Sequence, residues 1–200
     1  MKEGIRALHT IFNPDRIAVV GASDNPGKLG YHVMKSLTEG KYPGRIFPIN
    51  PGRKEIFGLK AFPSLAQVSE KIDLAIVVLP AEMVPQTIKE CEARTIPGMV
   101  LITAGFKEIE DRRGKMLQEE IQALAQRAGI RIIGPNTFGV VNLHYPVNAS
   151  FTPEFSSIEK GAVSLVSQSG GMSHLLGFLF IEERIGASKI VGLGNRCNVD

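Results

Sequence analysis

The feature that most constrains the fold is a repeated alternation of short apolar runs, glycine or proline turns, and segments of helical period. Five runs are apolar without interruption and are predicted to be buried strands: 16–20, 45–49, 74–79, 99–103 and 131–133. Three segments with one apolar face are predicted to be helices: 31–39, 82–94 and 112–128. Buried strands that alternate with helices are typical of a parallel sheet covered on both faces. The sequence therefore predicts a doubly wound, Rossmann-like α/β fold.

This alternation is interrupted after residue 142 and starts again near residue 161. The intervening segment has prolines but no helical period, and we interpret it as an ordered connector. The later part contains a strand, a turn, a helix and a strand, predicted at 162–166, 167–171, 172–183 and 189–193. We expect a complete domain at 1–142, a connector at 143–160 and the beginning of a second α/β domain at 161–200, too short for a core of its own.

Composition excludes several classes of function. Hydrophobic residues make up 44% and charged residues 22% of the chain, which is ordinary for a folded soluble protein. Aromatic content is 6%, tryptophan is absent, and the net charge is +3 without a run of basic residues, so neither nucleic acid nor a membrane surface is an expected partner. Cys91 and Cys197 lack metal or redox spacing and no signal peptide is recognisable, so we expect a cytoplasmic protein without a metal.

The loop after the first strand has the composition of a phosphate site. Gly21, Gly27 and Gly30 lie between that strand and the next helix. Backbone N–H groups and a helix N-terminus favour an anion there, and Lys28 can add a charge-assisted contact. A plain strand-to-helix turn is the alternative. The dinucleotide fingerprint is not matched, because its second and third glycine positions hold Ser23 and Pro26.

The second strand ends without the acid that usually binds the ribose of NAD. Asn50 and Pro51 stand there instead, followed by Arg53 and Lys54. Basic residues at this place suit an additional phosphate, although a solvated turn would also explain them. The pattern favours an adenine nucleotide with an extra phosphate, either NADP or coenzyme A.

Small residues follow the third and fourth strands, at 78–81 and 103–106. Ligands of open α/β sheets bind outside the carboxyl ends of the strands, and small residues permit close approach. Phe106 fits either an apolar wall or the core. Asn136, after the fifth strand, can donate and accept hydrogen bonds at the same rim.

A second candidate anion site is the turn 167–171, Ser-Gln-Ser-Gly-Gly, before a predicted helix. Two hydroxyls and two glycines at a helix N-terminus favour a phosphoryl group. A hydrolase nucleophile elbow is disfavoured, because Ser167 occupies the position of its first glycine. A turn with N-capping serines is the third alternative. We expect His174 to be a surface or packed residue rather than a catalytic base.

Together these motifs resemble the NDP-forming acyl-CoA synthetases, relatives of the succinyl-CoA synthetase alpha subunit. The resemblance extends from about Leu8 to Asp200 and is specific because seven motifs occur in order. They lie at 17–23, 48–51, 73–81, 103–106, 133–136, 148–151 and 167–171. The closing segment 194–200 resembles the family's Gly-Asn-x-x-Asp-Val-Asp loop, with Asn198 in place of the first Asp.

The resemblance implies a Rossmann-like CoA-binding domain followed by a flavodoxin-like domain. The family reaction converts acyl-CoA, ADP and phosphate into acid, CoA and ATP through a phosphohistidine. Matching motifs imply a CoA site formed by Gly21, Ala22, Ser23, Pro26, Lys28, Asn50, Pro51, Val78, Pro80, Thr103, Ala104 and Gly105, beside Asn136. They imply a phosphate site formed by Ser167, Ser169, Gly170 and Gly171.

The family's phosphohistidine, its assisting glutamate and the ATP-grasp part that holds ADP match no residue here. We therefore expect no catalytic residue within these 200 residues, no turnover by this chain alone, and an ATP-grasp portion or subunit as partner, with oligomerisation open. Two alternatives remain: a non-catalytic CoA- or acyl-CoA-sensing module, for example fused to an acetyltransferase, and an NADP-dependent oxidoreductase. The acyl group and the choice of ADP or GDP stay open.

Overall fold

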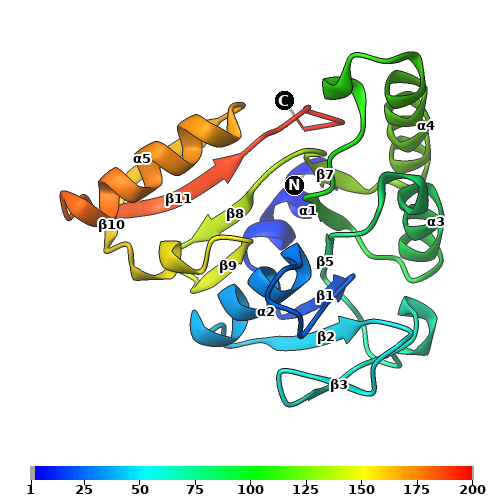
Figure 1. The fold of residues 1–200 in the computed structure, drawn as a ribbon, viewed down its shortest axis with the longest axis horizontal. Helices are drawn as coiled ribbons and strands as arrows, with labels where there is room; N and C mark the ends of the chain where they lie inside the picture. The colour runs from blue at the N-terminus through cyan, green and yellow to red at the C-terminus, as the bar shows by residue number, and fades with distance from the viewer. Residues whose placement is uncertain (1–2, 200) are drawn as a thin grey trace.

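The computed structural model describes residues 3–199, and a five-stranded parallel sheet lies at its centre (Figure 1). The strands lie in the order β2-β1-β5-β6-β7. Their bounds are β1 Arg16–Val20, β2 Arg45–Ile49, β5 Leu74–Val77, β6 Gly98–Leu101 and β7 Arg131–Ile133. β5 and β6 are buried at every position, as their uninterrupted apolar sequence requires. The predicted fold class is confirmed.

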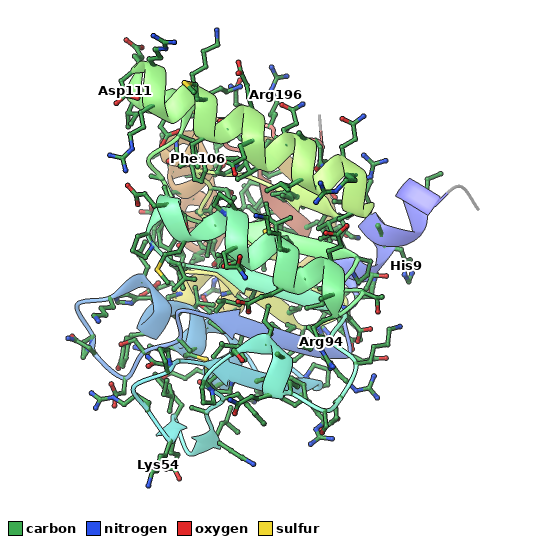
Figure 2. The ribbon with its side chains drawn as sticks, turned by 90° about the vertical axis from the view of Figure 1, so that its right-hand side faces the viewer. His9, Lys54, Arg94, Phe106, Asp111 and Arg196 are labelled. Atoms are coloured by element: carbon green, nitrogen blue, oxygen red, sulfur yellow. The ribbon has the colours of Figure 1, made fainter. Side chains whose placement is uncertain are left out.

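Helices cover both faces of this sheet. α3 (Val84–Ala93) and α4 (Arg112–Ala128) pack on one face, where Ile88 and Ile121 join the core (Figure 2). α1 (Glu3–Phe12) and α2 (Leu29–Glu39) pack on the other face through Ile11 and Leu37. Within residues 3–199 we find no helix with the length and apolar character needed to span a bilayer.

α1 is a helix that the sequence pattern did not reveal. Its buried residues Ala7 and Ile11 lie one turn apart and face β6 and β7. A Cβ on Gly98 would lie 2.5 Å from Ile11 Cγ1, so glycine lets α1 approach β6 closely. Asn142 Nδ2 donates to the carbonyl of Phe12 at 2.8 Å, which ties the end of α1 to a distant segment.

A small hairpin follows β2, formed by β3 (Glu55–Ile56) and β4 (Leu59–Lys60). Just beyond it, Phe62 donates its N–H to Pro48 and accepts from the N–H of Asn50, at 2.9 and 2.8 Å. These two bonds cover the outer edge of β2. The remaining short elements are 3-10 turns: η1 Leu65–Gln67, η2 Ala81–Met83, η3 Lys107–Ile109 and η4 Pro153–Ser157.

A second sheet has the order β10-β11-β8-β9 and carries α5 on one side (Figure 1). The bounds are β8 Gly139–Asn142, β9 Val147–Ser150, β10 Lys160–Ser167, α5 Gly170–Glu182 and β11 Ala187–Gly192. β10 and β11 are parallel, as a strand-helix-strand unit requires, whereas β8 is antiparallel to both β11 and β9. Val140, Val147 and Val191 belong to the same core as α1 and α2, so this sheet covers part of the first one.

The domain division at residues 142 and 160 stays a prediction. β8 lies before the first predicted boundary but pairs with β11 beyond the second. β9 and η4 lie in the predicted connector, and both pack against α2. Neither β8 nor β9 was expected from the sequence.

The loop after β11 returns to the first sheet. Asn198 lies beside the outer edge of β7, where its Oδ1 accepts from the N–H of Ile132 and its Nδ2 donates to the carbonyl of Ile130, both at 2.8 Å. Arg131 donates to the backbone carbonyl of Asn198 at 3.3 Å. One amide side chain therefore makes the hydrogen bonds that a sixth strand would make.

Asn198→Asp tests this edge contact. A carboxylate keeps the acceptor for Ile132 but loses the donor to Ile130, and it places a negative charge beside that carbonyl. We expect the free energy of unfolding to fall by about 1–3 kcal/mol, measured by urea denaturation at neutral pH. Equal stability of the two proteins would show that this contact is not formed in solution.

Gly30→Ala tests the contact between α2 and the end of β1. A Cβ at residue 30 would lie 2.0 Å from the carbonyl oxygen of Gly21, which is backbone and cannot rotate away. We expect a loss of about 1–3 kcal/mol in the same assay. Gly27→Ala is the matched control, because its Cβ would lie 3.4 Å from Asn25 Oδ1, and it should change stability little.

Candidate functional site

The carboxyl ends of the five parallel strands meet at one edge of the first sheet, where the turns that follow them are connected by hydrogen bonds. The N–H of Gly21 donates to Ile49 at 3.1 Å, and the N–H of Val78 donates to Val20 at 2.9 Å. The N–H of Asn136 donates to Thr103 at 2.8 Å. The turns predicted to form the CoA site are therefore brought together by the sheet.

The turn between β1 and α2 is shaped by glycine and by its own side chains. Gly21 has φ +93°, and a Cβ there would lie 2.7 Å from the carbonyl of Val78, so glycine is required. Ser23 Oγ accepts from the N–H of Asn25 at 3.0 Å, and Asn25 Oδ1 accepts from Gly27 at 2.9 Å. These two bonds lie within the turn itself and fix its local conformation.

The same turn leaves the N-terminus of α2 open. Lys28 is the N-cap residue and makes no side-chain cap hydrogen bond. The N–H of Tyr31 already donates to the carbonyl of Lys28 at 3.0 Å, so an anion would meet the first two N–H groups, those of Leu29 and Gly30.

Pro26 and Lys28 are exposed, whereas Ala22 and Ser23 are buried. The predicted CoA contacts of these four residues stay predictions. Because Ala22 and Ser23 are buried, they also help to shape the turn.

Asn50 joins the end of β2 to this turn. Its Nδ2 donates to the carbonyl of Ala22, and its Oδ1 accepts from Gly52, both at 2.8 Å. An acid could not donate to Ala22, which gives a structural reason for the amide. Arg53 forms an ion pair with Asp24 of the β1–α2 turn at 3.3 Å, which ties the segment after β2 to that turn. Lys54 is exposed on the hairpin (Figure 2).

The turns after β5 and β6 form the middle of the edge. Thr103 Oγ1 donates to the carbonyl of Leu79 at 2.8 Å, which joins the two turns. Ala104 and Pro80 are exposed, and Val78 is partly buried. Gly105 has φ +105°, a conformation that other residues rarely adopt.

Phe106 belongs to the core, not to an exposed wall. It is fully buried, below the N-terminal half of α4 (Figure 2). A Cβ on Gly114 would lie 2.2 Å from the Phe106 carbonyl, which shows how closely α4 covers this turn.

Sequence reasoning missed Glu108 as a residue of this edge. Its carboxylate accepts from the N–H groups of Gly105 and Phe106 and from Nδ2 of Asn195. Burial raises the pKa of Glu108, but these hydrogen bonds outweigh it and hold the pKa below its ordinary value. Glu108 is therefore ionised at neutral pH. In the sequence, the only hint of this role is that Glu108 follows Gly105 by three residues. Nothing in the sequence indicates its contact with Asn195.

The Ser-Gly turn lies before α5, apart from the β1–α2 turn (Figure 1). Ser169 caps α5, because its Oγ accepts from the N–H of Met172 at 3.3 Å. Ser167 Oγ donates to the carbonyl of Ser169 at 3.2 Å. A Cβ at Gly170 would meet no atom within 4 Å, so packing does not require glycine there.

His174 is a packed residue, as expected. Its ring lies among Phe138, Phe151 and Phe155. Nδ1 is 2.8 Å from the Gly170 carbonyl and Nε2 is 2.8 Å from Thr152 Oγ1, so both ring nitrogens are hydrogen-bonded.

Comparison with known proteins agrees with this geometry. The chain is 41% identical over 193 residues to the acetate–CoA ligase (ADP-forming) II subunit alpha of Pyrococcus furiosus, which covers 96% of this chain and 41% of that relative. It is also 41% identical over 192 residues to the acetate–CoA ligase (ADP-forming) of Methanocaldococcus jannaschii, which covers 96% of this chain and 26% of the relative.

A solved structure agrees as well. The dinucleotide forming acetyl-coenzyme A synthetase 1 of Ca. Korarchaeum cryptofilum, in complex with phosphate and ADP, superposes with a TM-score of 0.91 at 37% identity, over 96% of this chain and 40% of that one. The chain thus spans about two fifths or less of the length of these relatives. The resemblance to ADP-forming acyl-CoA synthetases is confirmed. Residues 15–142 match the family model described as a CoA binding domain, and the chain therefore belongs to the family of CoA binding domains.

Proposed function

We propose that this chain is the CoA-binding part of an ADP-forming acyl-CoA synthetase and that CoA binds along the carboxyl edge of the first sheet. The observation that carries the proposal is the open N-terminus of α2, with Lys28 exposed beside it, at the meeting point of the strand-end turns. Family membership and the names of the similar ligases support the same ligand.

In this proposal each part of the edge has a separate task. The first N–H groups of α2 and the ammonium of Lys28 bind a phosphate of CoA. Arg53, paired with Asp24, lies at the same turn, and the predicted contacts at Asn50, Pro51, Val78 and Pro80 line the edge beside it. The turn 103–105 and Asn136 form the far end of this edge, where exposed Ala104 permits close approach.

We further propose that the turn with Ser167, Ser169, Gly170 and Gly171 binds a phosphoryl group during the reaction. The open space around Gly170 supports this, because neither packing nor a positive φ explains the glycine. The ATP-grasp portion of the proposed synthetase, as a partner subunit or domain, would supply the nucleotide site. In such an assembly this chain supplies CoA binding and no phosphohistidine.

We propose the domain division 1–142, 143–160 and 161–200. Side chains exposed on β10 and α5 support the idea that the last of these units is incomplete. Six large apolar side chains are exposed on these two elements: Val163, Val166, Met172, Leu175, Phe178 and Leu179. Several large apolar side chains exposed on two neighbouring elements are typical of a surface that another part of a protein covers. We interpret residues 161–200 as the beginning of a larger unit.

We also propose that the protein is cytoplasmic.

Isothermal titration with CoA tests the proposal. We expect one CoA per chain. Adenosine should bind more weakly because it lacks phosphate, and NADPH should bind more weakly because it lacks the pantetheine arm that would lie along the turns after β5 and β6. If the chain is folded but the titration with CoA gives no heat of binding, the proposal is contradicted. Tighter binding of NADPH would instead favour an oxidoreductase.

Lys28→Ala separates phosphate recognition from the rest of the site. An exposed ammonium that contacts phosphate contributes about 0.5–1.5 kcal/mol, so CoA affinity should fall about 3- to 10-fold while adenosine affinity is unchanged. Lys89→Ala, which removes an exposed lysine of α3, is the control and should bind CoA like the unmodified protein. Equal CoA affinity in all three proteins would remove the role of Lys28.

A further inference from the structure

The carboxylate of Glu108 connects two segments that are far apart in the sequence. One oxygen accepts from the N–H of Gly105 and from the N–H of Phe106, the latter at 3.1 Å. The other oxygen accepts from Nδ2 of Asn195, in the loop after β11. A carboxylate can only accept hydrogen bonds, so these three donors fully explain its orientation.

Asn195 extends this connection to the neighbouring turn. It is 5% exposed, and its Nδ2 also donates to Oε1 of Gln118 on α4 at 2.9 Å. Its Oδ1 accepts from Nδ2 of Asn136 at 3.5 Å, and its own N–H donates to the carbonyl of Pro135 at 2.8 Å. Asn195 therefore contacts the turn after β7, while Glu108 contacts the turn after β6.

We propose that Glu108 is a positioning residue for CoA, which holds the turn at Gly105 in its binding conformation and joins it through Asn195 to the loop after β11. The inference rests on the proposed function, because it assigns a role at the same site. It adds a physical connection between that site and residues 193–198, which lie outside the segment matched by the family model.

The positioning role of Glu108 can be distinguished from a direct effect of its charge on CoA. CoA is an anion, and an ionised carboxylate beside it is unfavourable by Coulomb's law. Removal of the charge alone would therefore strengthen CoA binding. Loss of the turn's conformation would weaken it, so the two explanations predict opposite signs.

The test compares CoA affinity by isothermal titration in the protein and in Glu108→Gln. In the variant, the new NH₂ group faces Nδ2 of Asn195, donor against donor, and the connection is lost. We expect CoA to bind about tenfold more weakly or worse, on the scale of a lost charge-assisted hydrogen bond. Asn195→Asp, which sets two carboxylates against each other, should have a similar effect.

The double variant Glu108→Gln with Asn195→Asp is the rescue. The introduced amide can still accept from Gly105 and Phe106 through its oxygen, while its NH₂ donates to the introduced carboxylate. The hydrogen bond between residues 108 and 195 is restored with reversed polarity and an unchanged net charge. The amide of Gln118, which accepts from Asn195 in the starting protein, must turn so that its NH₂ group donates to the introduced carboxylate. CoA affinity should return to within about threefold of the starting protein. Glu119→Gln, at an exposed position of α4, is the charge control and should change affinity by less than about twofold.

The outcomes separate the proposals. No CoA binding by the starting protein overturns the proposed function and this inference with it. Unchanged or tighter binding by Glu108→Gln overturns the positioning role alone, as does a double variant that stays about tenfold weaker. Thermal unfolding checks that each variant is folded at the titration temperature. If the single variants are not, the double variant decides: affinity near that of the starting protein supports the inference.

Discussion

The central sheet is apolar on both faces, and the rest of the structure depends on covering it twice. Alternate residues of β1, β5 and β6 belong to two different cores, one below α3 and α4 and the other below α1 and α2. The second core also contains Val140, Val147 and Val191 of the other sheet. The two sheets are therefore not independent layers, since the second completes the cover of the first.

This cover also positions the site. Parallel strands must all enter their turns at the same edge, and the helices that return across each face begin there. The open N-terminus of α2, the turn at Gly105 and the turn at Asn136 are adjacent for that reason. Close packing of Gly30 on Gly21 then brings the start of α2 against the sheet.

The sequence pattern predicted the strands and helices of the alternating part because each element shows its apolar pattern within three to seventeen consecutive residues. It failed where structure depends on distant partners. β8 is a short apolar run whose partner β11 lies about fifty residues later, and no local pattern encodes that antiparallel pairing. α1 was missed as well, and its packing partners, β6 and β7, are distant in the sequence.

The site was predictable to the same extent. Glycines and a helix N-terminus are local features, and the turns that they indicated lie at one edge of the sheet, where CoA binding stays a prediction. The hydrogen bonds that hold the edge together join residues 28 positions apart, as in Asn50 with Ala22, or 87 positions apart, as in Asn195 with Glu108. Only the fold brings such residues into contact. The departure from the NAD pattern at Asn50 then has a structural reason, because only a donor can bind the Ala22 carbonyl.

The treatment of the sheet edges has a consequence for solubility. Phe62 pairs with Pro48 and Asn50 at the outer side of β2, and Asn198 pairs with Ile130 and Ile132 at the outer side of β7. Each contact leaves a foreign strand fewer backbone groups to pair with at that end of the first sheet. Within residues 3–199, β10 lies at one end of the second sheet and carries exposed Val163 and Val166. By this reasoning β10 is the edge at which an added strand would meet the most exposed apolar surface.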